Sequence, residues 1–471
     1  MATVQCMVHE TGRVCRNRPA FLGSDIRILY GELDLMVSAT AQLLRAAAIQ
    51  PGQRVAIYME SGWACSTLIL ALLRIGAVAC PLNTRLPVAA VKEQLDWIAC
   101  DTLIARIRET SRKQLPGITT LDPDGLVSRE LTSGQIDDSF SFELNQPAVV
   151  LFTSGSSGTP KAVQLTYGNL YYSAYGANQV LRLQSEDCWH LSLPLYHVGG
   201  LGILFRCLQS GAAMSVPDPE RTLAESLPEF PVTHVSLVST QLKRLLDAEL
   251  PAESRQRFKA ILLGGDAVPE PLFQAARSQR WPVLRTYGLT EMAAMVTACS
   301  PIDPPNAQQS SGKPLRYRDV KITGAGEICV RGATRFSGYV EGNTLTTPFD
   351  QEGWFHTGDL GQLDDLGYLH VIGRKDNQFT SGGENIQPET IERVLLTIPG
   401  VQQAIVRPQP DPEYGQRPIA YIQTQQPWDA VTITVYLRNH LPGYMIPDDI
   451  LPWPDTSDDS EVAPKMNRRD D

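Results

Sequence analysis

The chain has 471 residues, with 41 basic and 51 acidic side chains, so its formal net charge is −10. This balance argues against a general surface for nucleic acid or anionic membranes, although it leaves room for a local phosphate site. Apolar residues make up 43% of the sequence, which is ample for large cores, and the length predicts about two to four folding units.

The N-terminal segment lacks the charged and then apolar layout of a signal peptide, and we expect no membrane span. The most apolar stretch, 67–82, carries Arg74 near its middle and predicts a buried helix followed by a strand. Nine cysteines are scattered without a CxxC pair, which gives no support to a zinc or thioredoxin-like site. These features predict a cytoplasmic protein with reduced core cysteines.

From about residue 148 onward, short β-like runs alternate with turns and amphipathic segments. The runs are 148–152, 233–238, 260–263 and 283–287, the last leading into a glycine turn. Strand–loop–helix repetition at this spacing predicts a layered α/β fold with parallel strands.

The chain changes character in its last third. Segment 320–372 has short strands and Gly-rich turns, which predicts a β-rich subdomain, and a new helix and two strands follow it. We therefore predict a large N-terminal domain of layered α/β subdomains at 1–373 and a small, mobile α+β domain at 374–471.

The strongest motif is LFTSGSSGTPK at 151–161, a run dense in Gly, Ser and Thr that Pro160 and Lys161 close. Small residues let backbone N–H groups and hydroxyls face phosphate oxygens, while a lysine neutralises charge. It is not a Walker A loop, because no Gly-Lys-Ser/Thr follows at the required spacing. We expect this loop to lie between a strand and a helix start capped by Thr166, with a flexible linker as the alternative.

Three weaker motifs follow along the chain. In TYGLTE (286–291) a hydroxyl and a carboxylate can hold phosphate and Mg²⁺, while Tyr287 offers a ring face to a base. In WFHTGD (354–359) an exposed Asp359 can accept from both hydroxyls of a ribose. GRKD (373–376) is followed by SGGENI at 381–386. Each alone also fits an ordinary turn or helix cap, but together the four motifs supply the parts of an ATP–Mg²⁺ site.

In this order the motifs resemble the adenylate-forming superfamily of acyl-CoA synthetases, luciferases and peptide-synthetase adenylation domains, over about residues 20–450. The resemblance implies two half-reactions. A carboxylate attacks the α-phosphate of ATP and releases pyrophosphate, and a thiol such as that of coenzyme A then displaces AMP. ATP, Mg²⁺ and coenzyme A are thus the implied cofactors and co-substrates.

The resemblance also implies residue roles. Those for the β- and γ-phosphates are Thr153, Ser154, Gly155, Ser156, Ser157, Gly158, Thr159 and Lys161. Those around adenine, the α-phosphate and Mg²⁺ are Gly264, Gly265, Asp266, Tyr287, Gly288, Thr290 and Glu291, with Glu291 as the metal ligand and Lys161, Thr290 and Glu291 as catalytic groups. Those in the later motifs are Asp359 and Arg374 for the ribose, Asp376 as the hinge, and Gly382 and Gly383 for the thiol tunnel.

The superfamily's catalytic lysine lies near the C-terminus, usually in a Gly-Lys motif followed by an arginine. The tail TSDDSEVAPKMNRRDD has no Gly-Lys, and its best match is Lys465, with Arg468 three residues on. A disordered polar tail accounts for these residues equally well, so both interpretations stay open.

Three segments, 193–206, 233–246 and 373–392, resemble o-succinylbenzoate–CoA ligases of menaquinone or phylloquinone synthesis. This implies an aromatic carboxylic acid, 2-succinylbenzoate, as substrate. The implied acyl pocket consists of His197, Gly199, Gly200, Gly202, Ser239, Thr240 and Gln241. A packing role is the alternative for the histidine. Another aryl- or medium-chain acyl-CoA ligase, an adenylation module for a carrier protein and a degenerate nucleotide-binding protein remain alternatives for the whole chain.

Overall fold

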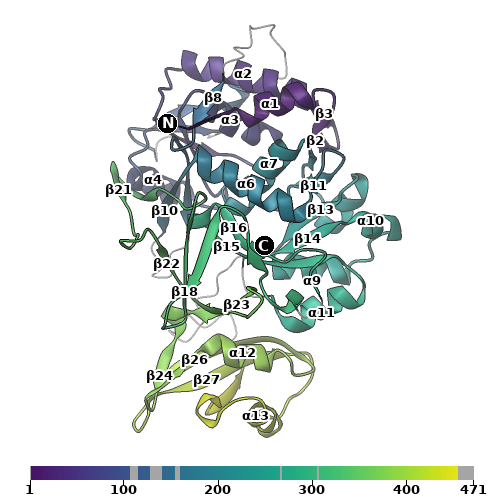
Figure 1. Cartoon of the computed structure of the whole chain (residues 1–471), viewed down its shortest axis with the longest axis vertical. Helices are drawn as coiled ribbons and strands as arrows, with labels where there is room; N and C mark the ends of the chain where they lie inside the picture. Colours follow the sequence, from purple (N-terminus) through teal and green to yellow (C-terminus); the bar gives the residue numbers. More distant parts are fainter. Residues whose placement is uncertain are drawn as a thin grey trace.

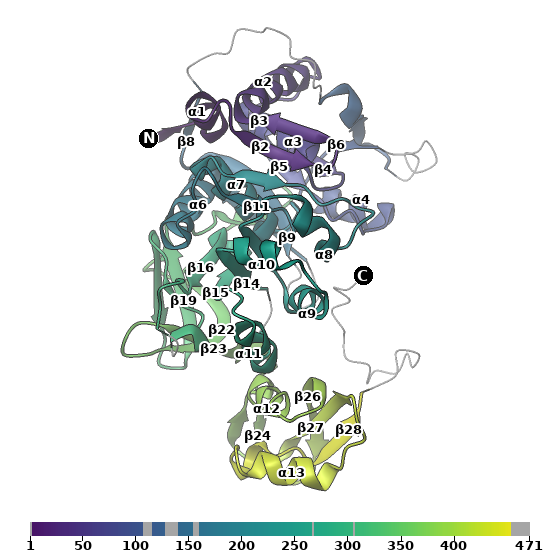
Figure 2. The ribbon, with the colours of Figure 1, turned by 90° about the vertical axis from the view of Figure 1, so that its right-hand side faces the viewer.

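The computed structural model describes residues 2–106, 115–127, 140–153, 160–265, 268–304 and 307–453. Figure 1 shows a large body of layered sheets and helices, with a small unit that contains α12 (Pro388–Leu395) and α13 (Ala430–Arg438) at one end of the long axis. The same division is visible in the turned view of Figure 2. The predicted α/β fold with a large N-terminal and a small α+β C-terminal domain is confirmed.

The first sheet has eight strands in the order β21-β20-β10-β9-β5-β4-β6-β7. Its strands are β4 (Arg54–Tyr58), β5 (Val78–Pro81), β6 (Thr102–Ala105), β7 (Thr119–Leu121), β9 (Pro147–Thr153), β10 (Lys161–Thr166), β20 (Gly338–Glu341) and β21 (Thr344–Thr346). Strands β9, β5, β4, β6 and β7 pair in parallel. The accompanying helices are α1 (Met7–Val14), α2 (Tyr30–Ala46), α3 (Trp63–Arg74) and α4 (Val88–Trp97). Helix α3 is buried from Cys65 to Arg74, and β5 follows it, as predicted for 67–82.

The second sheet has nine strands in the order β17-β16-β15-β14-β13-β11-β12-β2-β3. Its strands are β2 (Pro19–Gly23), β3 (Ile26–Leu29), β11 (Cys188–His190), β12 (Ala213–Ser215), β13 (His234–Leu237), β14 (Ala260–Leu263), β15 (Val283–Leu289), β16 (Ala294–Ala298) and β17 (Lys313–Pro314). The central strands from β2 to β15 are parallel. The accompanying helices are α6 (Tyr167–Leu181), α7 (Val198–Ser210), α8 (Leu223–Ser226), α9 (Ser239–Asp247), α10 (Ala252–Arg257) and α11 (Glu270–Ser278). The main hydrophobic core joins residues of α2, α3, α6 and α7 to both sheets.

One local prediction is wrong. The run at 151–161 does not lead from a strand into a helix, because β9 and β10 form an antiparallel pair in which Thr153 faces Lys161. Helix α6 begins only after β10, where Thr166 caps it by accepting from the Asn169 backbone N–H at 3.1 Å, so the predicted cap is confirmed. Residues 162–166 are buried on both faces of the sheet, and they therefore lack the polar–apolar alternation that would have revealed a strand.

The last third of the chain contains three smaller sheets. The β-rich part is a four-stranded antiparallel sheet of β18 (Arg318–Ile322), β19 (Glu327–Gly332), β22 (Phe355–Leu363) and β23 (Leu369–Arg374). The small unit holds β24 (Phe379–Ser381), β25 (Glu384–Ile386), β26 (Val401–Asp411), β27 (Gly415–Thr424) and β28 (Asp449–Pro452). It has a separate core that includes Ile391, Val406 and Leu437. An N-terminal ribbon pairs β1 (Thr3–Gln5) with β8 (Ser141–Glu143).

The cysteines agree with the sequence-based expectation. All nine are free thiols, and eight of them are buried, while Cys15 is partly exposed. Within the described ranges we find no helix with both the length and the apolar character that a bilayer crossing requires.

Candidate active site

Several predicted site residues lie at one edge of the second sheet. His190, Leu237 and Leu263 end three neighbouring parallel strands, β11, β13 and β14. The segments that follow them contain, in turn, His197, then Ser239 and Thr240 at the start of helix α9 rather than in the predicted turn, and Gly264 with Gly265. In open α/β sheets, ligands bind outside the carboxyl ends of the strands. The candidate nucleotide and acyl residues therefore lie along the expected edge.

Glu291 lies in a short 3₁₀ turn, Thr290–Met292, immediately after β15. Its carboxylate accepts a hydrogen bond from the Tyr339 hydroxyl at 2.8 Å. Burial raises the pKa of Glu291, while Tyr339 and the charge of Lys161 act to lower it. Lys161 lies with Nζ 5.1 Å from the centre of the Tyr339 ring. The structure thus brings Lys161 and Glu291 together, and it adds Tyr339, which local sequence patterns did not reveal.

The backbone beside Glu291 is strained. Ala293 and Ala294 follow the turn with φ of 52° and 93°, in the left-handed region that alanine rarely adopts. Such strain persists where the surrounding structure enforces it, and it clusters at functional sites. It supports the assignment of this turn to the site.

The predicted glycine turn after 287 is wrong. Strand β15 continues through Gly288 to Leu289, paired with β16, and the register shifts between Tyr287 and Gly288. A Cβ at Gly288 would lie 2.3 Å from the Ala294 carbonyl oxygen. The glycine therefore permits close approach of two strands rather than a chain reversal.

Tyr287, Asp359, Arg374 and Asp376 form a continuous polar network. The two carboxylate oxygens of Asp359 accept from the Tyr287 hydroxyl at 2.6 Å and from Arg374 Nη1 at 2.8 Å. Arg374 Nη2 also donates to Asp376 at 3.0 Å. Burial lowers the pKa of Arg374, but the two carboxylates outweigh burial and the net shift is upward. The predicted ribose and hinge residues are therefore in contact.

The expectation that Asp359 is exposed is wrong. Asp359 lies inside β22 opposite Arg374 on β23, and its side chain is 16% exposed. The sequence Gly-Asp suggested a turn, but Gly358 here has φ of 73° beside the guanidinium of Arg374, within a paired strand.

The donor set fits a magnesium ion that the protein shares with a nucleotide. Within the described ranges, no group of three or more His, Cys, Asp or Glu side chains lies together as a metal site. Mg²⁺ is commonly held by one or two carboxylates together with substrate phosphates. Glu291, a partly buried carboxylate whose hydrogen-bond donor is a neutral phenol, suits that arrangement.

The predicted acyl-pocket residues lie in two adjacent segments. His197 is the exposed N-cap of α7, and Gly199 and Gly200 lie in its first turn. The side chain of Gln241 reaches the Ser192 carbonyl at 3.5 Å, which joins the start of α9 to the segment before α7.

Arg206 is a second residue that sequence reasoning missed. It is 3% exposed in α7, and its guanidinium lies 4.4 Å from the centre of the Trp189 ring and donates to Met295 Sδ at 3.4 Å. A Cβ at Gly202 would lie 3.1 Å from Arg206 Nη1. No carboxylate in the described part of the chain forms a salt bridge with Arg206, and burial lowers its pKa to about 10. Arg206 is thus a buried cation that pairs with no described carboxylate and lies beside Gly202, one of the predicted acyl-pocket residues.

Gly200→Ala is expected to destabilise the protein, because Gly200 is closely packed against the segment before α7. The added Cβ would lie 2.1 Å from the Pro194 carbonyl oxygen and 2.5 Å from that of Leu193, so the backbone must move. We expect about 1–3 kcal/mol lower free energy of unfolding in urea, the usual effect of overpacking. Gly324→Ala, where a Cβ meets nothing within 4 Å, should leave the urea midpoint unchanged. Equal midpoints for both variants would contradict this close packing.

The remaining predicted residues fall into two groups. Gly382 and Gly383 form the turn between β24 and β25, with φ of 56° and 87°. Thr153 ends β9, and Lys161 begins β10. Lying outside the described residues are Ser154, Gly155, Ser156, Ser157, Gly158, Thr159, Asp266 and Lys465.

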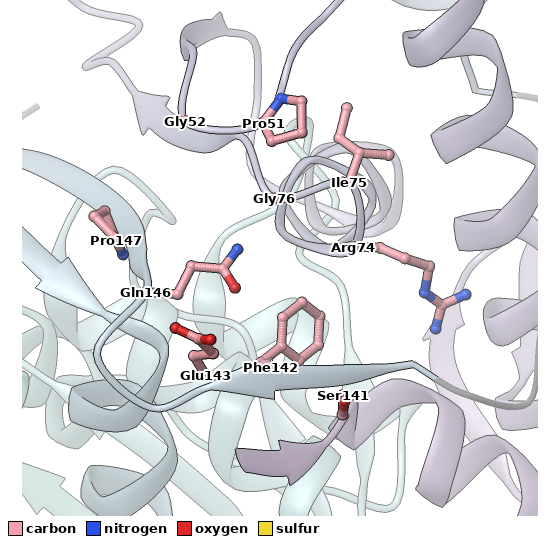
Figure 3. A pocket seen from close by; sticks show the side chains of 10 residues that line it. All are labelled: Pro51, Gly52, Arg74, Ile75, Gly76, Ser141, Phe142, Glu143, Gln146 and Pro147. Atoms are coloured by element: carbon pink, nitrogen blue, oxygen red, sulfur yellow. The ribbon is translucent and has the colours of Figure 1, made fainter. Parts of the chain in front are cut away.

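A surface cavity of about 560 Å³ lies elsewhere (Figure 3). Its lining includes Gly52 and Gly76, which lie two residues before β4 and β5, and Pro147, which begins β9. Gln146 extends toward the helix end at Gly76. This is the amino edge of the first sheet, whereas Thr153 ends β9 at the opposite edge, so the cavity is separate from the candidate active site.

Comparison with known proteins identifies the family of the chain. The family model described as AMP-binding enzyme matches residues 8–340, and the model for the AMP-binding enzyme C-terminal domain matches residues 390–457. A 2-succinylbenzoate–CoA ligase of Bacillus cereus is 33% identical over 462 residues, which cover 95% of this chain and 94% of that ligase. The ligase of the same name from Bacillus subtilis is 31% identical, over 93% and 92% of the two chains.

Solved structures give the same result. An o-succinylbenzoate CoA synthetase of Bacillus subtilis in complex with the acyl-adenylate intermediate has a TM-score of 0.85 at 29% identity, covering 96% of this chain and 95% of that chain. Its complex with ATP and magnesium ion has a TM-score of 0.84 at 29% identity, covering 96% of each chain. The predicted resemblance is confirmed, and the chain belongs to the AMP-binding enzyme family, that is, to the adenylate-forming enzymes.

Proposed function

We propose that this chain is a 2-succinylbenzoate–CoA ligase. It would convert 2-succinylbenzoate, ATP and coenzyme A into 2-succinylbenzoyl-CoA, AMP and pyrophosphate, through an acyl-adenylate. The observation that carries the chemistry is the assembly of Lys161, Glu291, Tyr287, Asp359 and Arg374 in one region. The names of relatives that match over more than nine-tenths of the chain support the choice of acid.

The nucleotide is held by groups from several strands in this proposal. Asp359 and Arg374 bind the ribose, Tyr287 with Gly264, Gly265 and Asp266 surrounds adenine, and the loop from Thr153 to Lys161 holds the β- and γ-phosphates. Thr290 and Glu291 would hold the α-phosphate and Mg²⁺, and the metal ion would neutralise phosphate charge when bound. Negative charge grows on the α-phosphate as the carboxylate attacks, and Lys161 with preorganised N–H groups stabilises it.

The second half-reaction involves the small domain. We place its start at Arg374, with Asp376 as the hinge, and assign Gly382 and Gly383 to the path of the coenzyme A thiol. In this conformation Arg374 joins the hinge residue Asp376 to Asp359, so nucleotide binding and hinge position share one guanidinium. We assign adenylation assistance to Lys465.

The acyl pocket would recognise a diacid. We assign Arg206 to the carboxylate of 2-succinylbenzoate that is not activated, because a buried guanidinium without an anionic partner is costly until an anion reaches it. His197, Ser239 and Thr240 would contact the polar groups of the acid. A long aliphatic acid would leave Arg206 unpaired.

Incubation with ATP, Mg²⁺, coenzyme A and 2-succinylbenzoate should yield AMP and the coenzyme A thioester, identified by mass. Reactions with benzoate and with medium-chain fatty acids serve as controls for the acid. Product from those acids alone would keep the ligase chemistry and contradict the proposed substrate. If no acid yields AMP or thioester, the protein is a nucleotide-binding homologue and the ligase proposal is wrong.

A further inference from the structure

One short segment holds Glu291 at two points. The Phe336 backbone N–H donates to the Glu291 carbonyl oxygen at 2.8 Å, and three residues later the Tyr339 hydroxyl donates to Glu291 Oε1 at 2.8 Å. The Ser337 N–H donates to the Gln164 carbonyl at 2.9 Å, which fastens the segment to β10. Backbone and carboxylate of Glu291 are therefore both fixed by residues 336–339.

The same tyrosine also contacts Lys161. Strand β20 pairs with β10, with Tyr339 opposite Val163, two residues after Lys161. The lysine ammonium lies 5.1 Å from the centre of the Tyr339 ring, within the range of a cation–π contact. The Phe336 ring also packs against the Tyr339 ring in an edge-to-face arrangement, with the ring centres 4.9 Å apart. One side chain thus touches both the carboxylate and the cation that the proposed function assigns to Mg²⁺ and phosphate.

We propose that Tyr339 is a positioning residue that orients the Glu291 carboxylate for Mg²⁺ through its hydroxyl and places the Lys161 ammonium through its ring. This rests on the proposed function for the roles of Glu291 and Lys161. Hydrogen bonds to a metal-ligating carboxylate fix its rotation, and removing such a partner typically lowers metal affinity or activity about 10–100-fold. Tyr339 itself touches neither substrate nor metal in this arrangement.

The test is calorimetric titration of ATP at a series of Mg²⁺ concentrations and in EDTA. Tyr339→Phe keeps the ring and removes the hydroxyl. It should need about 10-fold more Mg²⁺ for half-maximal ATP affinity. Its ATP affinity in EDTA should stay within about twofold of wild type, because the contact between the ring and Lys161 remains. Tyr339→Leu, which removes both contacts, should also weaken ATP binding in EDTA.

Tyr368→Phe is a matched control. The Tyr368 hydroxyl also donates to a carboxylate, Asp303 Oδ1 at 3.1 Å, and its ring also lies beneath a lysine, with Lys313 Nζ 4.5 Å from the ring centre. Its Mg²⁺ requirement should equal that of the wild type. In the Glu291→Gln background, Tyr339→Phe should not raise the Mg²⁺ requirement any further, since the two residues act through one carboxylate.

Three results would overturn the positioning role: an unchanged Mg²⁺ requirement in Tyr339→Phe, an equal loss of ATP affinity in EDTA, or full additivity with Glu291→Gln. Thermal unfolding of Tyr339→Phe and Tyr368→Phe shows whether both variants are folded. If Tyr339→Phe is not folded, titrations of Lys161→Met and Glu291→Gln still test the coupling between Mg²⁺ and ATP binding. No acid is present in these titrations. Failure of 2-succinylbenzoate to react would therefore contradict the assigned substrate, but it would leave the Mg²⁺ titrations of the Tyr339 variants unaffected.

Discussion

Asp359→Asn is expected to lower kcat/KM for ATP about 100-fold, because hydrogen bonds to a charged group contribute about 1.5–3 kcal/mol each. In the free protein, Asp359 accepts from Tyr287 and Arg374, one donor on each oxygen. A carboxylate offers about four acceptor positions, so two remain for the hydroxyls of a ribose. The asparagine keeps one acceptor oxygen and loses the charge that pairs with Arg374.

Deoxy nucleotides make this prediction specific. Wild-type protein should prefer ATP over 2′-deoxy-ATP and 3′-deoxy-ATP, and Asp359→Asn should lose most of that preference, because the missing hydroxyl and the missing charge remove the same contact. Asp319→Asn is the control, since Asp319 pairs with Arg331 at 3.0 Å in the same four-stranded sheet and is exposed. An Asp359→Asn variant that still discriminates against deoxy nucleotides as strongly as wild type would remove Asp359 from the ribose site.

Elements whose residue types give a local signal were predictable. The run at 260–263 is uniformly apolar and became the buried central strand β14, and 388–395 has its apolar residues at helical spacing and became α12. Strand β10 was missed because it lies inside the sheet, paired with β9 on one side and with β20, more than 170 residues later in the sequence, on the other. Its state is thus determined partly by a neighbour that is distant in sequence.

The candidate site also has residues that their motifs identified and residues that only the fold reveals. Asp359 and Arg374 were identified from their motifs, but their pairing across β22 and β23 depends on strand register, which the motifs do not contain. Tyr339 was missed because its partners, Glu291 and Lys161, lie 48 and 178 residues away, and no local pattern connects them. Arg206 stands in an apolar helical run where a lone charge is usually a surface residue, and only its burial reveals it.

Arg206→Met is expected to lower kcat/KM for 2-succinylbenzoate about 10–150-fold, since it removes a hydrogen-bonded charge worth about 1.5–3 kcal/mol. An analogue that lacks the second carboxylate should react equally well with wild type and Arg206→Met, because it has no group for the guanidinium to hold. The kinetic parameters for ATP should be unchanged. The ratio of the two acids, measured on each protein, isolates recognition of the carboxylate from general damage.

Stability provides an independent check on the same residue. Arg206 pairs with no carboxylate among the described residues, so its replacement by methionine removes an unfavourable desolvation. Arg206→Met should therefore unfold in urea at or above the wild-type midpoint. Arg74→Met is the contrasting variant, because Arg74 pairs with the buried Asp34 at 2.6 Å, and breaking that pair should cost about 3–5 kcal/mol. A strongly destabilised Arg206→Met that retains its preference for the diacid would instead make Arg206 a packing residue against Trp189, and the carboxylate would have to be bound elsewhere.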